Sequence, residues 1–214
     1  MNAASGRIWV ASECALVLID YQPAVIDMVF EQDHRVIELN VTTLAKAAID
    51  FNIPVVLSTV GVRLGVSTPT IERLKAALPG VDEIDRSSMN AWEEPGFVEA
   101  IRATGRAKLV MCGIMTSSCL AYAAIAALDE GFEVMFVEDA VGDQYQRKHE
   151  MAIERLMQAG AIPNSTISMI SEWFRDWKSP LAPAARKHFI EHFEAMAPLK
   201  IKPERYQPKG LLGK

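Results

Sequence analysis

The sequence predicts an α/β fold: a single doubly wound, Rossmann-like domain of three layers (α/β/α) with a mostly parallel sheet of about six strands. Short, continuous apolar runs, typical of strands buried on both faces, recur along the chain. They alternate with stretches of helical periodicity, and strands separated by helices pair in parallel through right-handed crossovers. The length of 214 residues fits one domain. Helices are therefore expected on both faces of an open sheet.

The elements follow one another in a regular order. Apolar runs predict strands at 15–19, 54–58, 108–113, 133–137 and 166–170. Helical spacing, prolines at first helical positions and glycine stops predict helices at about 33–52, 68–80, 95–105, 117–130 and 146–159, with helical sequence again from 172 onward. The predicted domain comprises residues 1–197. The basic segment 198–214 is expected to be an extended tail that acts as an oligomerisation arm, the alternative being a frayed terminus.

Composition and charge exclude several classes of protein. The net charge is −5, whereas a nucleic-acid-binding protein needs a basic face, so no nucleic-acid partner is expected. No apolar segment is long enough to cross a membrane, and no membrane partner is expected. Cys14, Cys112 and Cys119 have spacings that suit neither a disulfide framework nor a zinc site. Free thiols are typical of a reducing compartment, so we predict a cytoplasmic location.

Three polar or nucleophilic side chains follow predicted strands, at the edge of the sheet where such folds bind ligands. Asp20 ends the first strand, and it is either a catalytic carboxylate or the cap of the next turn. Arg86 lies in a polar loop, and it is either a cation beside the site or a solvated surface arginine. Cys119 opens an apolar helix and is either a nucleophile or a small packed residue.

The position of Cys119 favours chemistry. A thiol in the first turn of a helix faces the positive end of the helix dipole, which is expected to favour the reactive thiolate. The amides of the same turn can also hold negative charge on a substrate oxygen. Cys14 and Cys112 are expected to serve packing, because Cys14 lies at the opposite end of its strand and Cys112 is embedded in an apolar run.

These segments together resemble the isochorismatase-like cysteine hydrolases, over roughly residues 10–180. The family pattern has an aspartate at the end of the first strand, often followed by glutamine, as in Asp20-Tyr21-Gln22. Its second element is a lysine followed by two small residues and an aromatic, for which this chain has Arg86 and then Asn90-Ala91-Trp92. Its third and most specific element runs from Gly113 through Thr116 to Cys119. Arginine at position 86 and the Asn-Ala-Trp triplet are most similar to the YcaC-like subgroup.

The resemblance implies a mechanism and a site. Cys119 would attack an amide, carbamoyl-like or ester carbonyl to form a thioacyl enzyme, with Asp20 moving the proton and Arg86 steadying both groups. The amides of Met115 and Cys119 would form the oxyanion hole, and a cis peptide would lie between Ile114 and Met115. The substrate pocket would be lined by Tyr21, Gln22, Asn90, Trp92, Ile114 and Met115, with Ile26 and Leu64 as further candidates. The activity expected is hydrolysis of C–N bonds other than peptide bonds in a small molecule.

Two departures from the family pattern narrow this expectation. Arginine in place of lysine at position 86 stays charged and cannot donate a proton. Residues 60–67, which correspond to the Asp-x-His-x-x-His metal site of nicotinamidases, contain no histidine and no acid. We therefore expect no metal and no cofactor, and nicotinamide is disfavoured as substrate. His188 and His192, four residues apart on a predicted helix, are expected on a solvated face rather than at a metal.

Two other functions remain open, and an assembly is expected. The chain is alternatively a catalytically silent small-molecule binder or assembly protein on the same fold. A third possibility is a redox-sensing thiol protein, which is weakened because no second cysteine lies close in sequence to Cys119. The resemblance also implies a homo-oligomer, with an octamer as the assembly that it suggests.

Overall fold

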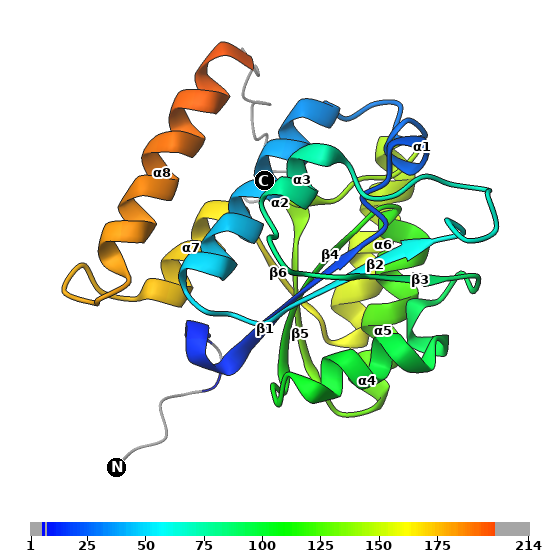
Figure 1. Ribbon diagram of the computed structural model, residues 1–214, viewed down its shortest axis with the longest axis horizontal. Helices are drawn as coiled ribbons and strands as arrows, with labels where there is room; N and C mark the ends of the chain where they lie inside the picture. The colour runs from blue at the N-terminus through cyan, green and yellow to red at the C-terminus, as the bar shows by residue number, and fades with distance from the viewer. Residues whose placement is uncertain (1–5, 7, 200–214) are drawn as a thin grey trace, which may run out of the picture.

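The computed structural model describes Gly6 and residues 8–199 and shows one parallel sheet of six strands (Figure 1). The proposed oligomerisation arm therefore lies outside the described residues except for its first two positions. All five strand pairings are parallel. From one edge to the other, the strands are β3 (Glu83–Arg86), β2 (Val55–Val60), β1 (Cys14–Ile19), β4 (Lys108–Gly113), β5 (Glu133–Val137) and β6 (Ile162–Asn164).

Helices cover both faces of the sheet, which confirms the predicted three-layer α/β fold (Figure 1). One layer contains α2 (His34–Asp50), α7 (Thr166–Phe174) and α8 (Ala182–Met196), with α8 packed on α2. The other contains α4 (Pro95–Ala103), α5 (Ala121–Asp129) and α6 (Gln146–Ala159). Two short helices, α1 (Pro23–Ile26) and α3 (Glu72–Ala76), follow β1 and β2. Short 3₁₀ turns occupy Ala11–Glu13 (η1), Ala91–Glu93 (η2), Glu138–Ala140 (η4) and Ala197–Leu199 (η5), and a π-helical turn occupies Thr116–Leu120 (η3).

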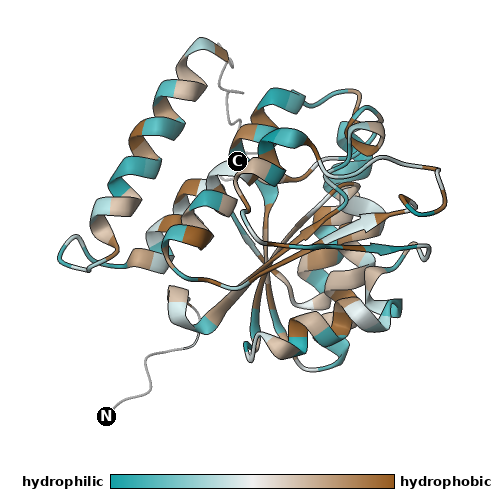
Figure 2. Ribbon diagram, in the orientation of Figure 1, coloured by the Kyte–Doolittle hydropathy of each residue, from teal (hydrophilic) through white to brown (hydrophobic). Residues whose placement is uncertain are grey.

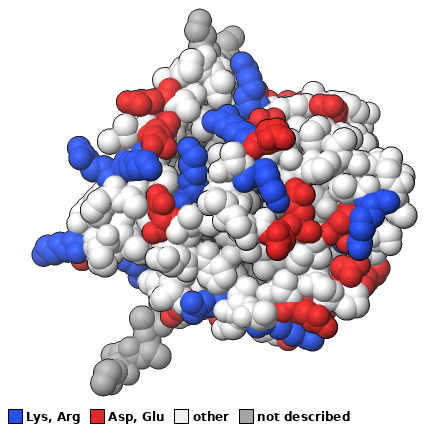
Figure 3. Space-filling model, in the orientation of Figure 1, with Lys and Arg blue, Asp and Glu red and all other residues white. Residues whose placement is uncertain are grey.

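The apolar runs form the centre of the molecule because both faces of the sheet are covered. Every residue of β1 is buried, and so are the five residues after Lys108 in β4. The central strands are accordingly hydrophobic along their length (Figure 2). On the face drawn in Figure 3, basic and acidic side chains are interspersed rather than gathered by sign. No helix in the described part of the chain is long and apolar enough to cross a membrane.

Two strands differ from the sequence-based prediction. The strand predicted at 166–170 is wrong: these residues belong to helix α7, and the last strand is β6. Thr166 begins the helix because its backbone amide and hydroxyl both donate to Asp139 Oδ1, at 2.9 and 2.7 Å. Arg86, predicted in a polar loop, is instead the last residue of the edge strand β3, whose first three residues are only half-buried. An edge strand covered on one side needs no apolar run, so the periodicity signal is weak there.

Helix α8 also differs from expectation on one face. His188 and His192 are buried against α2 instead of solvated, with exposures of 1% and 5%. His188 Nε2 lies 2.9 Å from Asp50 Oδ2, and His192 Nε2 lies 2.7 Å from Asn40 Oδ1. Both contacts attach α8 to α2, so the two histidines stabilise the packing of these helices.

Candidate active site

The candidate site lies at the carboxyl edge of the sheet, between its two central strands. The strand order β3-β2-β1-β4-β5-β6 reverses direction between β1 and β4, and ligands bind at such a switch point in open α/β sheets. Asp20 follows β1 directly, and the turn that carries Cys119 follows β4. The topology therefore brings together residues that are 99 positions apart in the sequence.

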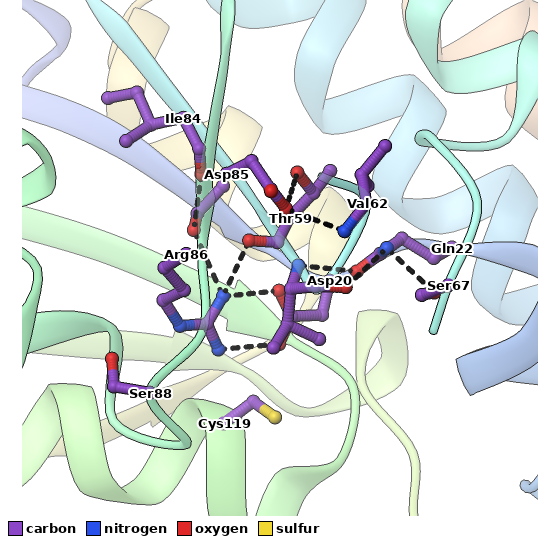
Figure 4. Close-up of polar contacts among 12 residues, drawn as sticks. Asp20, Gln22, Thr59, Val62, Ser67, Ile84, Asp85, Arg86, Ser88 and Cys119 are labelled. Atoms are coloured by element: carbon purple, nitrogen blue, oxygen red, sulfur yellow. Dashed lines mark hydrogen bonds and ion pairs between the residues drawn. The ribbon is translucent and has the colours of Figure 1, made fainter. Parts of the chain in front are cut away.

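Asp20 and Arg86 form a fully buried, two-pronged ion pair (Figure 4). Arg86 Nη1 donates to Asp20 Oδ1 at 2.6 Å, and Arg86 Nη2 donates to Oδ2 at 2.7 Å. Asp20 has a backbone φ of 60°, rare for a residue with a side chain, at the point where the chain leaves β1. Paired hydrogen bonds of this kind fix the plane of the carboxylate as well as its position.

The end of β2 holds the arginine in place. Arg86 Nη1 also donates to Ser58 Oγ and to the Thr59 carbonyl oxygen, each at 3.1 Å. The pKa of Arg86 is raised, because the lowering effect of burial is outweighed by the hydrogen bonds and charge of Asp20 and, after it, by Cys119. The guanidinium therefore stays charged and rigid. Breaking such a buried pair by removing one partner costs about 3–5 kcal/mol.

The turn that carries Cys119 begins with the expected cis peptide bond between Ile114 and Met115. The π-helical turn η3 follows, so Cys119 lies within an irregular turn before α5 rather than in the regular helix predicted at 117–130. Segment 142–149 fixes this turn. Thr116 N donates to the Gly142 carbonyl at 2.8 Å, and Ser117 N donates to Asp143 Oδ2 at 2.7 Å.

His149 completes this support from α6. Its Nδ1 lies 2.9 Å from Thr116 Oγ1 within the protein interior. Sequence reasoning gave no role to His149 or Asp143, because each contacts the turn from more than 25 residues further along the sequence. The position of Asp143 just beyond β5, at the ligand edge, is the signal that could have identified it.

Cys119 is only 4% exposed and lies beside the ion pair (Figure 4). Burial raises the pKa of its thiol to about 12, with the charge and hydrogen bond of Asp20 acting in the same direction. Arg86 and a backbone hydrogen bond at Met115 lower the pKa by less. The expectation of a helix-stabilised thiolate was therefore wrong. The first-turn amides of Thr116 and Ser117 face oxygen acceptors in segment 142–149 instead of the sulfur.

The backbone amides near the sulfur differ in their contacts. The backbone at Met115 lowers the pKa of the Cys119 thiol, which is the effect of a nearby donor. The amide of Cys119 has no acceptor outside its own turn within the described residues. By contrast, the amides of Ser118 and Leu120 both donate to the Met115 carbonyl.

Two of the predicted pocket residues make other contacts. Tyr21 is fully buried, and its hydroxyl donates to the Ala140 carbonyl at 2.6 Å rather than facing the sulfur. Gln22 is also fully buried: its Nε2 donates to Ser67 Oγ at 2.8 Å and to the Thr68 carbonyl at 2.6 Å, and its Oε1 accepts from Val60 N at 2.9 Å. Gln22 therefore braces the loop after β2 (Figure 4).

The Asn-Ala-Trp triplet also has structural contacts. Asn90 Oδ1 accepts from Trp92 N at 3.0 Å, which begins the turn η2. Trp92 Nε1 donates to Glu130 Oε1 at 2.9 Å. Glu130 is 11 residues after Cys119, so its backbone lies about 16 Å further along the helix axis at 1.5 Å per residue. Ile114 and Met115, in contrast, lie in the turn itself and are both buried.

The groups that a metal site or thiol redox chemistry would use, and the candidate pocket residue Leu64, lie as follows. Within the described residues, no group of three or more His, Cys, Asp or Glu side chains is placed to hold a metal ion. All three cysteines are free, and burial raises the pKa of the Cys112 thiol in β4. The exposed loop tip at Leu64 is 65% accessible to solvent.

The fold and the site define a class: a doubly wound α/β protein in which a buried thiol, carboxylate and guanidinium meet at the carboxyl edge of a parallel sheet. The model of the isochorismatase domain matches residues 14–168, which is more than half of the chain. The chain therefore belongs to the isochorismatase family, a family of hydrolases, and within it to the YcaC-like subgroup.

Individual relatives agree with this assignment. "Probable hydrolase YcaC" of Escherichia coli (strain K12) is 33% identical over 171 residues, 79% of this chain and 82% of that protein. The solved E. coli YcaC, described as an octameric hydrolase of unknown specificity, has a TM-score of 0.82 at 30% identity and covers 92% of this chain and 98% of its own. YcaC from Pseudomonas aeruginosa, solved with hexane-2,5-diol and covalent acrylamide, has a TM-score of 0.81 at 28% identity, covering 92% and 99%.

Proposed function

We propose that this chain is a metal-free cysteine hydrolase that cleaves the C–N bond of a small amide or carbamoyl-like substrate, or a related ester, through a thioacyl-enzyme intermediate. The observation that carries the proposal is the position of the buried Cys119 thiol beside the Asp20 carboxylate, which Arg86 holds at both oxygens (Figure 4). A nucleophile beside a base that a third group orients is the arrangement that nucleophilic catalysis requires.

The raised pKa of Cys119 determines the order of the first step. Because the thiol is protonated at neutral pH, Asp20 accepts the proton from Sγ as the sulfur attacks the carbonyl carbon. Each carboxylate oxygen accepts more than one hydrogen bond, so Asp20 can contact both Arg86 and the thiol. The carbonyl oxygen becomes an oxyanion, and the N–H groups of Met115 and Cys119 hold it.

Asp20 also takes part in each of the remaining proton transfers. The tetrahedral intermediate collapses, the C–N or C–O bond breaks, and Asp20 returns its proton to the leaving amine or alcohol. In the second half, Asp20 accepts a proton from water as the water oxygen attacks the thioester. The C–S bond breaks, and the proton passes back to Sγ. Arg86 remains charged throughout and keeps the carboxylate in place.

The test is hydrolysis of a panel of small primary amides, carbamoyl compounds and activated esters. We expect turnover of at least one C–N substrate by the unmodified chain and loss of turnover in Cys119→Ser. Cys112→Ser is the matched control, because Cys112 is equally buried but lies in β4, beside Tyr21, and should retain activity. Absence of turnover across the panel would favour a silent small-molecule binder, and equal activity in Cys119→Ser would exclude Cys119 as the nucleophile.

The surroundings of the thiol guide the choice of panel. The site side chains are buried, and Ile114 and Met115, which precede Cys119 in the same turn, are apolar. A small acyl group is therefore favoured over an extended or charged one. Acrylamide, which is covalently bound in the P. aeruginosa relative, is a suitable small-amide probe of access to Cys119.

A further inference from the structure

Helix α8 is the outermost helix of the fold, and no described element covers its outer side (Figure 1). Its inner face, with His188 and His192, packs on α2. On the outer face, Ile190 is 45% exposed and Phe193 is 58% exposed.

This face belongs to a continuous aromatic surface. The ring of Phe193 lies 6.4 Å from that of Phe189, which lies 6.1 Å from Trp177 in the turn between α7 and α8. Trp177 is 62% exposed. Large aromatic side chains exposed next to one another are characteristic of interaction sites rather than of ordinary protein surface.

The charges on α8 have an order that an isolated helix does not favour. Arg186 lies in the N-terminal half and Glu194 in the last turn, while the first turn contains no acid and the last turn no base. The helix dipole favours acids at the N-terminus and bases at the C-terminus, so Glu194 is placed unfavourably for its own helix. The two side chains are about 12 Å apart along the axis and cannot pair with each other. Neither has an ion-pair partner within the described residues.

We propose that the outer face of α8 is a two-fold interface with α8 of a second copy of this chain. Arg186, Ile190 and Glu194 follow one another at intervals of four residues and therefore share one helix face. In an antiparallel pair centred on Ile190, Arg186 of each copy faces Glu194 of the other. Such a contact is self-complementary, as a two-fold interface requires.

The same geometry assigns the apolar residues. The two Ile190 side chains meet at the centre of the pair, and a hollow of about 400 Å³ lined by Pro183, Arg186, Lys187, Ile190 and Glu191 receives apolar side chains of the second helix. Phe193 then lies near the apolar stem of Lys187 of the second copy, where cation–π contact is available. The dipoles of the two helices run in opposite directions, so each Glu194 meets the N-terminal half of the facing helix.

Charge reversal tests the interface directly. Arg186→Glu places acids opposite acids at both ends of the pair, and Glu194→Arg places bases opposite bases. We expect each variant alone to show at least a twofold lower particle mass than the unmodified 214-residue chain by light scattering. An equimolar mixture of the two variants restores both attractive contacts, so its mass should return to that of the unmodified chain.

The mixture separates the interface from a folding defect, because only folded chains can recover the assembly. Arg147→Glu is the matched control: Arg147 lies on α6 and its side chain is 70% exposed, and its reversal should leave the mass unchanged. The proposal is overturned if the unmodified chain is monomeric or if the single variants keep its mass. It is equally overturned if the mixture fails to recover that mass or if Arg147→Glu lowers it as well.

Discussion

Asp20→Asn removes the charge that faces both Arg86 and Cys119 while preserving the size of the side chain. It leaves the guanidinium of Arg86 buried with no carboxylate, since both Nη atoms contact Asp20. We expect a loss of about 3–5 kcal/mol of unfolding free energy. At about 2–4 °C per kcal/mol for a chain of this size, the melting temperature should fall by about 6–20 °C.

The same substitution should make the thiol more reactive. With a pKa of about 12, about one Cys119 in ten thousand is a thiolate at pH 8. Burial raises this pKa first, and it persists in the variant, but the second and third causes are the charge and hydrogen bond of Asp20. In Asp20→Asn these are lost and Arg86 faces the sulfur alone, so the thiol pKa falls. Hydrolysis should nevertheless fall about 10²–10⁴-fold, because the proton acceptor is gone.

The assay is the rate of iodoacetamide labelling at pH 8, with the modified cysteine located by peptide mass spectrometry. Labelling is measured well below the melting temperature of the variant, and unreacted Cys14 and Cys112, both buried, report that the fold is intact. Asp27→Asn, an exposed aspartate after α1, is the matched control and should match the unmodified chain. Slower or unchanged labelling of Cys119 in folded Asp20→Asn would refute the electrostatic reasoning.

Three further predictions concern the surroundings of the site. Arg86→Lys keeps the charge but loses the two-pronged contact, so it should lower the free energy of unfolding by about 2 kcal/mol and retain hydrolysis. Arg86→Met should lower it by about 3–5 kcal/mol and abolish hydrolysis. Urea unfolding and turnover assays measure the two effects. Burial lowers the pKa of His149, so the unfolded chain binds its proton first and stability should decrease as pH falls below 6.5, by at most about 1.4 kcal/mol per pH unit for this group. Urea unfolding at pH 7 and pH 5 checks this, and a His149→Gln variant with an unchanged pH dependence would contradict it. In Gly142→Ala, the new Cβ would lie 2.8 Å from Ile37 Cδ1 and 2.9 Å from Gln32 Oε1. We expect the free energy of unfolding to fall by about 1–3 kcal/mol, and hydrolysis to slow because the Gly142 carbonyl, which accepts from Thr116 N, is displaced. An unaltered melting curve and rate would refute this prediction.

The sequence predicts the buried elements better than the edges of the sheet. The strands β1 and β4 are short, continuous apolar runs, the pattern typical of strands buried on both faces. The strand predicted at 166–170 is the start of helix α7, because these five residues are mainly apolar and too few to show helical spacing. Its buried residues Met169, Ile170 and Trp173 have helical spacing, and this appears only in a window that extends to 174.

The sequence predicts which three side chains meet at the candidate site, but not their surroundings. Asp20 follows β1, Arg86 is the last residue of β3 and Cys119 lies in the turn after β4, and parallel topology brings such positions to one edge. The direction in which Tyr21 and Trp92 point depends on partners far along the chain, Ala140 and Glu130, and no local pattern encodes them. The raised pKa of the thiol likewise depends on burial and on the facing carboxylate rather than on the helix start.

The most direct test of Cys119 and Asp20 as nucleophile and base is to trap the acyl group on the enzyme. Folded Asp20→Asn is mixed with p-nitrophenyl acetate, and the acetylated residue is located by peptide mass spectrometry. The variant has a more acidic thiol but no base to activate water, so a thioester should accumulate on Cys119, while the unmodified chain turns over and retains none. Acetylation at another residue, or no covalent product in the variant, would contradict the mechanism.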